Sequence, residues 1–508
     1  YDTLTALPKG SDLGAALVEA MTAIERDFEP LLNQLPKDCG KFDNTLLEDL
    51  LRVFDRETLR TARGDVFGRI YEYFLMKFAM QGAQDNGEFF TPPSLVQTIV
   101  NVIEPNHGTV FDPACGSGGM FVQSSHFIEH HGQDTSKAVT FFGQEKTATT
   151  IRLAKMNLAV HGLEGDIREA NTFYEDVHPI FGKCDFVMAN PPFNVDMVDA
   201  EKVKDDRRLP FGLPGVNKGK KVSNGNYLWI SYFHSYLGPK GRAGFVMSSQ
   251  ASSAGHGEAE VRRKLVETGD VDVMIAIRSN FFYTRTVPCE LWHLDKGKPK
   301  ERRDQILMID ARHVFRKVTR KIFDFSPEQA MNLTAIVWLY RGEQPRFLDL
   351  VTRYSKKLCA EASKVGTALQ PFEKKRGTVF EQLSAFAKAT AKINGIPEEP
   401  HTALAGAADE IAEAAKAYEG DLSVLVKELQ AFLKKYDSNL PTNNKAQHAA
   451  RQAFDPIAER IKGLTKQIDL LYKLTARAAQ LAGELGSNDA AALPTVPANV
   501  TRTAVPRA

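Results

Sequence analysis

Hydrophobic positions recur at helical spacing in the first part of the chain. Apolar side chains repeat every three to four positions over residues 13–20 and again over residues 70–78. This spacing is typical of amphipathic helices. A turn-rich break, Gln-Asp-Asn-Gly, follows at residues 84–87. The pattern predicts an N-terminal helical domain over residues 1–85.

The pattern then changes to short, continuous apolar runs that alternate with amphipathic stretches. Runs of β-branched and aromatic residues of this length are typical of strands buried on both faces of a parallel sheet. The alternation predicts an α/β domain with a Rossmann-like, doubly wound sheet over residues 86–350. The expected strands are 109–112, 139–143, 186–189, 243–247, 271–277 and 305–310.

Helical spacing returns in the last third of the chain, where residues 351–485 are predicted to form a helical tail. One apolar stripe covers residues 422–432, and a second, close to a heptad repeat, covers residues 461–485. Residues 438–444 are expected to be the turn between two antiparallel helices. The Ala-, Pro- and Thr-rich segment 486–508 is expected to be disordered.

Composition and charge narrow the functional classes. The 508 residues are 43% hydrophobic, enough for a sizeable core, and the net charge is only +1. Because neutralising phosphates supplies much of the affinity for nucleic acid, any DNA binding requires local basic patches or a partner. Five scattered cysteines without a C-x-x-C pair favour a cytoplasmic location and no zinc or other metal site. No apolar run is long enough to span a membrane.

A glycine-rich octapeptide, DPACGSGG at residues 112–119, directly follows a predicted strand and precedes an amphipathic helix. Glycines let the backbone approach a ligand closely, and the free N–H groups of a helix start face that ligand. The spacing differs from the dinucleotide fingerprint G-x-G-x-x-G. It resembles the methionine-binding loop of class I methyltransferases, although a glycine-rich turn without a ligand is the alternative. The expected cofactor contacts are Asp112, Ala114, Gly116, Ser117, Gly118 and Gly119.

An acidic residue, Glu145, ends the next predicted strand. A carboxylate in this place can accept hydrogen bonds from both ribose hydroxyls of a nucleoside. Downstream, either Asp166 or Asn171 is a candidate to bind the adenine of a cofactor, and Asn171 is preferred. Either side chain could instead cap a helix.

The tetrapeptide Asn190, Pro191, Pro192 and Phe193 follows the predicted strand 186–189. The two prolines stiffen the turn. The Asn190 side-chain oxygen and the Pro191 carbonyl can then accept hydrogen bonds from one planar amino group, while Phe193 offers a flat face to a base. Amino nitrogens conjugated to a ring are poor nucleophiles. Two acceptors would localise the nitrogen lone pair for attack on a methyl donor, so catalysis would consist largely of positioning.

Together these motifs resemble the amino-methylating DNA methyltransferases, in particular the modification subunit of type I restriction-modification systems. Two further segments resemble that family. The segment GEFFTPP at residues 87–93 is similar to a cofactor-contacting segment, and residues 279–288 are similar to a late strand-hairpin near the substrate pocket. The resemblance covers roughly residues 10–350. It implies that the cofactor is also contacted by Glu88, Phe89, Phe90, Thr91 and Pro92.

The resemblance implies a class I fold, S-adenosyl-L-methionine as cofactor, and methylation of adenine N6 in double-stranded DNA with the base extruded. It also implies a specificity subunit as partner, a second modification subunit, and a separate restriction and translocase subunit. The chain itself has no G-x-x-x-x-G-K-[ST] loop for an ATP-driven motor. The apolar stripes at 422–432 and 461–485 are candidates for docking the specificity subunit, with an intramolecular helical hairpin as the alternative.

Two points stay open at this level. The long polar stretch between residues 196 and 226 is expected to close over the base or touch phosphates, with a solvated mobile loop as the alternative. The tetrapeptide also serves cytosine N4, guanine N2 in RNA and glutamine amides in proteins, so it does not fix the acceptor. A catalytically silent, cofactor-binding scaffold is the hypothesis from a different class.

Overall fold

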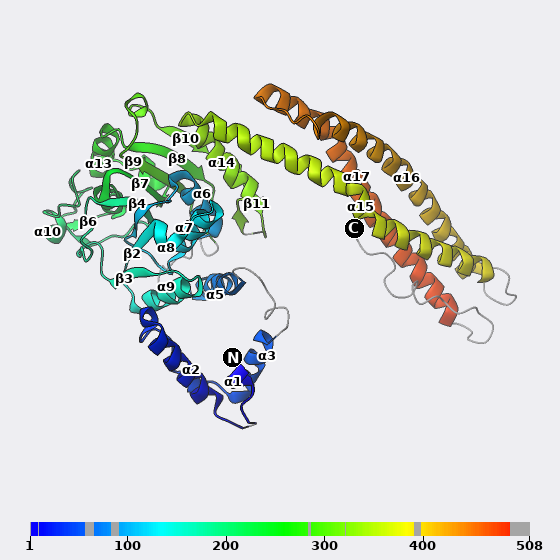
Figure 1. Ribbon diagram of the computed structural model, residues 1–508, viewed down its shortest axis with the longest axis horizontal. Helices are drawn as coiled ribbons and strands as arrows, with labels where there is room; N and C mark the ends of the chain where they lie inside the picture. Colours follow the sequence, from blue (N-terminus) through cyan, green and yellow to red (C-terminus); the bar gives the residue numbers. More distant parts are fainter. Residues whose placement is uncertain are drawn as a thin grey trace. The chain divides into compact units, whose positions relative to one another are not determined.

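The computed structural model describes residues 2–8, 10–55, 66–82, 91–282, 286–320, 322–390 and 398–487. The chain forms two compact units, Tyr1–Arg341 and Gly342–Ala508, and each is described by itself (Figure 1). The expected helical domain 1–85 falls within the first unit. The turn expected at residues 84–87 lies outside the described residues.

The N-terminal part of the first unit is helical. Its helices begin at side chains that accept from free backbone N–H groups, as helix starts require. Asp12 accepts from the N–H of Ala15, and Asp43 accepts from the N–H of Thr45. The helices are α1 (Asp2–Thr5), α2 (Leu13–Asp27), α3 (Asn44–Phe54) and α5 (Val66–Gly82), with short 3-10 turns η1 (Glu29–Leu31) and η2 (Cys39–Lys41).

An eight-stranded sheet forms the centre of the first unit, in the order β10-β8-β9-β7-β4-β1-β2-β3. All neighbouring strands run parallel except those next to β9, which is antiparallel to both β7 and β8. The strands are β1 (Gly108–Asp112), β2 (Val139–Glu145), β3 (Gly165–Glu169), β4 (Cys184–Ala189), β7 (Leu237–Ser248), β8 (Val271–Ile277), β9 (Cys289–Asp295) and β10 (Leu307–Asp310).

The predicted doubly wound α/β fold is confirmed, although two strands of the central sheet, β3 and β9, were not predicted. The sequence of β3, GDIRE, contains a single apolar residue, and the sequence of β9, CELWHLD, interrupts its apolar positions with polar ones. Neither segment presents the continuous apolar run on which the prediction relied. The antiparallel β9 also makes the sheet mixed rather than wholly parallel.

Helices cover both faces of the sheet and bury two apolar clusters (Figure 1). One face packs under α6 (Pro93–Ile103), α7 (Gly119–His130), α9 (Ala148–Val160) and α14 (Pro327–Tyr340). The other packs under α11 (Asn226–Tyr236) and α13 (His256–Glu267). Every residue of α11 is buried, which explains its lack of an amphipathic pattern. Short helices are α8 (Thr135–Ala138), α10 (Ala200–Val203), α12 (Gln250–Ser253) and the 3-10 turn η3 (Lys300–Arg302).

The polar stretch between residues 196 and 226 is folded onto the sheet domain, so the expectation of a mobile loop is wrong. It contains α10 and a small antiparallel pair, β5 (Val198–Asp199) and β6 (Lys221–Val222). One of its cations, Arg208, is 2% exposed and forms an ion pair with Asp206. Arg208 therefore supports the fold and is not available to a DNA phosphate.

The second unit consists of three long helices, α15 (Gln344–Thr390), α16 (Glu398–Tyr436) and α17 (Asn444–Ser487). The turn expected at 438–444 joins α16 to α17. The stripes at 422–432 and 461–485 pack against each other and α15 in one apolar core, where Leu425 and Leu471 are fully buried. Of the two alternatives for these stripes, the structure agrees with intramolecular helix packing, because their own bundle buries them. Residues 488–508, most of the tail expected to be disordered, lie outside the described residues.

None of the helices in the described ranges combines the length and hydrophobicity that a bilayer crossing requires.

Candidate active site

The glycine-rich octapeptide forms a tight turn between β1 and α7. Gly116 and Gly118 adopt positive φ angles of 51° and 78°, which glycine alone accepts without strain. The N–H of Gly118 donates to the carbonyl of Cys115 at 2.8 Å. A Cβ atom added at Gly116 or Gly119 would meet no atom within 4 Å. The backbone at the start of α7 thus faces open space, as a ligand-binding loop requires.

Two buried polar side chains hold this turn in shape. Asp112 is 1% exposed and accepts from the N–H of Ala114 at 2.9 Å. Burial raises the pKa of the Asp112 carboxyl well above its usual range, and the negative charge of the nearby Glu145 raises it further. The hydrogen bond from the N–H of Ala114 acts in the opposite direction and lowers this pKa. The Asn157 amide donates to the carbonyl of Ser117 at 2.8 Å. These two hydrogen bonds therefore help to fix the shape of the turn.

Glu145 links the second strand to the glycine turn. Its Oε2 accepts from the N–H of Gly116 at 3.1 Å, and its Oε1 accepts from Lys146 and Thr147 at 2.8 and 3.1 Å. A carboxylate can accept hydrogen bonds from several donors at once. Glu145 also lines a pocket.

This pocket has a volume of about 280 Å³ and lies along the carboxyl ends of β1, β2, β3 and β4. It brings together three predicted residues, Ala114, Glu145 and Asn171, with Pro192 of the tetrapeptide. Asp166 is instead engaged by Arg168 at 2.6 Å. The remaining lining residues were not predicted: Pro113, Lys146, Ala170, Thr172, Phe173, Tyr174, Val195, Asp196, Met197, Val198 and Trp229.

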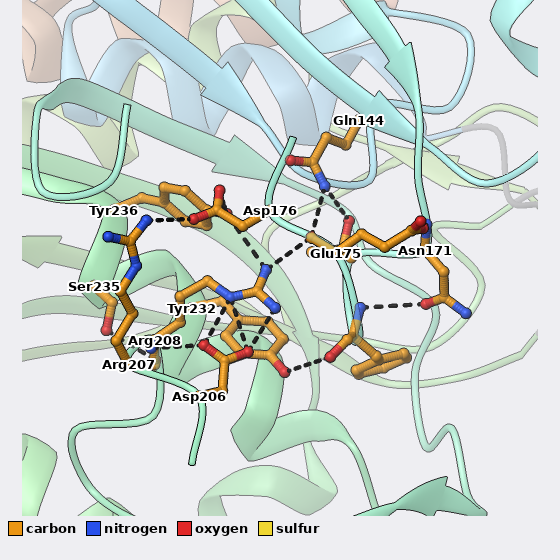
Figure 2. A network of polar contacts seen from close by, with 12 residues as sticks. Gln144, Asn171, Glu175, Asp176, Asp206, Arg207, Arg208, Tyr232, Ser235 and Tyr236 are labelled. Atoms are coloured by element: carbon orange, nitrogen blue, oxygen red, sulfur yellow. Dashed lines mark hydrogen bonds and ion pairs between the residues drawn. The ribbon is translucent and has the colours of Figure 1, made fainter. Parts of the chain in front are cut away.

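A polar network braces the wall of the pocket formed by residues 170–174. The Thr172 hydroxyl donates to the carbonyl of Pro113 at 2.6 Å and accepts from Gln144 at 3.0 Å. Figure 2 shows the Arg208 side chain between Asp206 and the backbone of Glu175. The guanidinium of Arg208 donates to the carbonyl of Glu175 at 3.1 Å. These contacts link the first turn, the wall and the stretch after β4 into one rigid frame.

Asn190 lies at the carboxyl end of β4, the strand beside β1. Its Nδ2 donates to the Thr91 hydroxyl at 2.8 Å. Its Oδ1 is buried and accepts no hydrogen bond in the described part of the chain. An unsatisfied buried acceptor costs about 1–3 kcal/mol. Asn190 Oδ1 is one of several such atoms in the described chain, and it differs from most of them in standing next to a pocket. The geometry leaves the amide oxygen of Asn190 available to a donor that is not part of the chain.

The rest of the tetrapeptide is fixed by packing. Pro191 is buried, and the half-buried Phe193 packs edge-on against Phe282, with ring centroids 6.1 Å apart at 81°. The residue after it, Asn194, exchanges two hydrogen bonds of 2.8 Å with Asn226 at the start of α11. The turn is therefore rigid, and its aromatic ring contacts the segment 279–288.

The predicted site residues thus gather at one edge of the sheet. Thr91 bonds to Asn190, whereas the glycines of the turn stand beside the pocket without lining it. Pro92 is buried just before α6. Glu88, Phe89 and Phe90 lie outside the described residues. Residues 170–174 carry no local motif, and only their place after a strand could have indicated them.

Comparisons with known proteins agree with this arrangement. The family model described as N-6 DNA Methylase matches residues 62–363. The chain is 41% identical over 261 residues to the type I restriction enzyme MjaIX methylase subunit of Methanocaldococcus jannaschii, covering 51% of this chain and 46% of that protein. It is 34% identical over 337 residues to the HindI methylase subunit of Haemophilus influenzae, covering 63% and 73%.

A solved structure shows the same fold. The type I restriction-modification methyltransferase subunit from Streptococcus thermophilus matches with a TM-score of 0.53 at 22% identity, over 63% of this chain and 69% of that one. The alignment with the M. jannaschii protein spans only about half of that relative's length. The family model nevertheless covers more than half of this chain and includes every described residue of the candidate site. The chain therefore belongs to the N-6 DNA methylase family, among the methylase subunits of type I restriction enzymes.

Proposed function

We propose that the chain transfers a methyl group from S-adenosyl-L-methionine to N6 of adenine in double-stranded DNA. The observation that carries the proposal is the buried, unpartnered Oδ1 of Asn190 at the carboxyl end of β4. Pro192, two residues on, lines the pocket that also contains Glu145. An acceptor for an amino group thus stands next to a pocket suited to a nucleoside.

The residues of the pocket fit that cofactor. Glu145 has acceptor capacity for ribose hydroxyls, and Asn171 and Phe173 offer a polar and an aromatic contact for its adenine. Gly116 and Gly119 leave open space at the start of α7 for the methionine part. When bound, the cofactor supplies an electrophilic methyl group on a positively charged sulfur.

Asn190 and Thr91 prepare the acceptor side. The Thr91 hydroxyl accepts from Asn190 Nδ2 and so fixes which end of the amide is free. Oδ1 then accepts a hydrogen bond from the adenine amino group, and the Pro191 carbonyl accepts the second. These two hydrogen bonds draw the lone pair of the amino nitrogen out of conjugation with the adenine ring, so that it points toward the methyl group. These acceptors are held in place beforehand, so no reorganisation is needed when the nitrogen becomes more positive.

The relatives support a multi-subunit assembly. Both curated relatives are described as methylase subunits of type I restriction enzymes. We infer that this chain works with a specificity subunit that reads DNA, with a second copy of itself and with a restriction and translocase subunit. The net charge of +1 supports this division of labour. All five cysteines are free and buried, which supports a reducing, cytoplasmic setting.

Methyl transfer with tritiated cofactor tests the proposal. Adenine-containing duplexes are incubated with the chain, with and without a specificity subunit, and the DNA is digested to nucleosides. Label is expected in N6-methyladenine and to increase with the specificity subunit. Label in cytosine, RNA or protein would overturn the assignment of adenine in DNA. Cofactor binding without any transfer under either condition would favour the silent scaffold.

A further inference from the structure

A short hairpin lies at the same edge of the sheet as Asn190. β8 and β10 run parallel to β7 and β4, so their carboxyl ends share the edge at which β4 ends. The hairpin, β11 (Arg316–Lys317) paired with β12 (Phe323–Asp324), directly follows β10 (Figure 1). With strands about 4.8 Å apart, β8 and β10 stand about 15–20 Å from β4.

The base of the hairpin is anchored to the segment that packs on the catalytic turn. The N–H of Phe323 donates to the carbonyl of Asn280 at 3.1 Å. Phe325 packs on Phe281, with ring centroids 4.7 Å apart, and both rings are buried. The next residue, Phe282, contacts Phe193 of the tetrapeptide. The hairpin is therefore held in a fixed place relative to Asn190.

The exposed side of the hairpin is basic. Residues 312–320, RHVFRKVTR, contain arginines and a lysine and no acidic residue. Arg312 and Arg316 pair with Asp310 and Asp324 at 2.7 and 2.6 Å. In contrast, Lys317 and Arg320 are exposed and have no carboxylate partner among the described residues. In a chain with a net charge of +1, such unpaired cations form a local positive surface.

Arg278 adds a third unpaired cation beside the hairpin. It directly follows β8, and its guanidinium carbon lies 4.1 and 4.2 Å from the ring centroids of Phe315 and Phe323. Its Nε is buried without a partner in the described ranges, and no described carboxylate pairs with it. Two aromatic rings hold the planar guanidinium, so little side-chain freedom remains to be lost on binding. A guanidinium held in this way suits a phosphate, to which it can donate two parallel hydrogen bonds.

We propose that Arg278, Lys317 and Arg320 bind backbone phosphates of the DNA strand that carries the target base. This inference rests on the proposed function, and it names the surface that positions the substrate. One strand of duplex DNA rises about 3.4 Å per nucleotide, so 15–20 Å corresponds to about five nucleotides. Phosphate contacts fix register without reading sequence, which fits a chain that leaves sequence reading to a partner.

Charge reversal on the hairpin tests the proposal against a matched control. The test variant is Lys317→Glu with Arg320→Glu. The control is Lys300→Glu with Arg303→Glu. These two exposed residues form no ion pair with a described residue, and they lie at η3, just before β10 and thus at the opposite edge of the sheet. Both variants change the charge of the chain equally. Affinity for an adenine-containing duplex is measured by fluorescence anisotropy between 50 and 200 mM salt, in the assembly in which the wild type binds DNA.

The hairpin variant is expected to bind at least tenfold more weakly than wild type. The slope of log affinity against log salt should become shallower by about 2, since each phosphate contact contributes about 0.9. The control should keep the wild-type slope. Arg278→Lys keeps the positive charge but cannot donate two parallel hydrogen bonds to one phosphate. This variant should bind DNA more weakly than wild type, with a salt slope close to that of wild type.

Two results would overturn the proposal. One is equal affinity and slope in the hairpin and control variants. The other is a hairpin variant that binds DNA normally but no longer copurifies with a protein partner, which would make the surface a protein-docking site. The binding assay needs no methyl transfer. A wild type that binds DNA but never methylates it would therefore contradict the proposed function while leaving the hairpin result intact.

Discussion

The two edges of the central sheet hold different kinds of buried polar group. At the amino edge, a buried carboxylate is doubly paired: Asp272, fully buried, bonds to Arg341 at 2.9 Å and to Arg302 at 3.1 Å. The His234 ring lies 2.7 Å from Asp270. At the carboxyl edge, Asn190 Oδ1 and Arg278 Nε are buried without partners in the described chain.

This difference separates groups that hold the fold from groups kept for a ligand. Unpaired buried polar atoms cost stability, so a fold retains them where a ligand completes the hydrogen bonds. At the amino edge, the carboxylate of Asp272 is already satisfied by two arginines and therefore stabilises the fold. The comparison predicts that substitutions at the amino edge affect unfolding, whereas substitutions at the carboxyl edge affect binding and rate.

The largest effect is expected from Asp272→Ala, at the amino edge. The change leaves Arg341, whose side chain is 4% exposed, buried without its carboxylate. Breaking a buried ion pair costs about 3–5 kcal/mol, and we expect the free energy of unfolding to fall by that amount. All three tryptophans, Trp229, Trp292 and Trp338, lie in the first unit, so their fluorescence during denaturation reports on this unit.

The exposed Asp304, at the same edge, provides the control. Asp304→Ala should change stability by no more than about 0.5 kcal/mol. Equal and small effects of both substitutions would mean that the ion pair does not stabilise the sheet.

At the carboxyl edge, Asn190→Ala should slow methyl transfer about 10²–10³-fold, because it removes a prepared acceptor from the reacting nitrogen. Stability should fall by only about 0.5–1.5 kcal/mol, since the single side-chain hydrogen bond lost is the one from Nδ2 to the Thr91 hydroxyl. Cofactor affinity, measured by calorimetry, should stay near that of wild type. Asn106→Ala, an exposed asparagine before β1, is the control and should retain full rate. Retained activity in Asn190→Ala would remove Asn190 from the mechanism.

A smaller effect is expected from Glu145→Gln. The neutral amide loses charge-assisted hydrogen bonds worth about 1.5–3 kcal/mol, so the cofactor Kd should rise about ten- to a hundredfold. Glu169→Gln is the matched control, since Glu169 pairs with Glu145 in the β2–β3 register and is exposed. A rise of the same size in both variants would indicate a general loss of negative charge at this edge, with no specific ribose contact.

The smallest effect is expected from Thr91→Val, which removes the acceptor that orients the Asn190 amide. One hydrogen bond is worth about 0.5–1.5 kcal/mol, so kcat should fall about two- to tenfold, and Thr91→Ser should restore it. The kcat and KM values separate two roles. A change confined to the KM for cofactor would mean that Thr91 contacts the cofactor and does not position Asn190.

The sequence predicted what depends on neighbours in the chain. The turn at residues 112–119 and the tetrapeptide at 190–193 carry their geometry in local glycines and prolines, so both were placed correctly at strand ends. The strand β9 was not predicted, because polar residues interrupt its apolar run. In the tail, helical spacing predicted the helices, but only the packed bundle showed that they cover each other's stripes.

Contacts between distant residues could not be predicted from local patterns. Thr91 and Asn190 are 99 positions apart, and nothing near either residue indicates their hydrogen bond. The wall at residues 170–174 lines the pocket because β3 ends beside β2. Likewise, Arg278 acquires its two aromatic neighbours from the hairpin that follows β10. These features depend on strand order, which the motifs alone do not specify.

The most direct test is a structure of the chain, in its active assembly, with an adenine-containing duplex and a cofactor analogue that lacks the transferable methyl group. The decisive quantity is the distance between adenine N6 and Asn190 Oδ1. We expect a distance of about 2.7–3.2 Å, with Nδ2 still bonded to the Thr91 hydroxyl. An extruded adenine whose N6 lies beyond hydrogen-bond distance of Oδ1, or an amide turned so that Oδ1 faces Thr91, would contradict it.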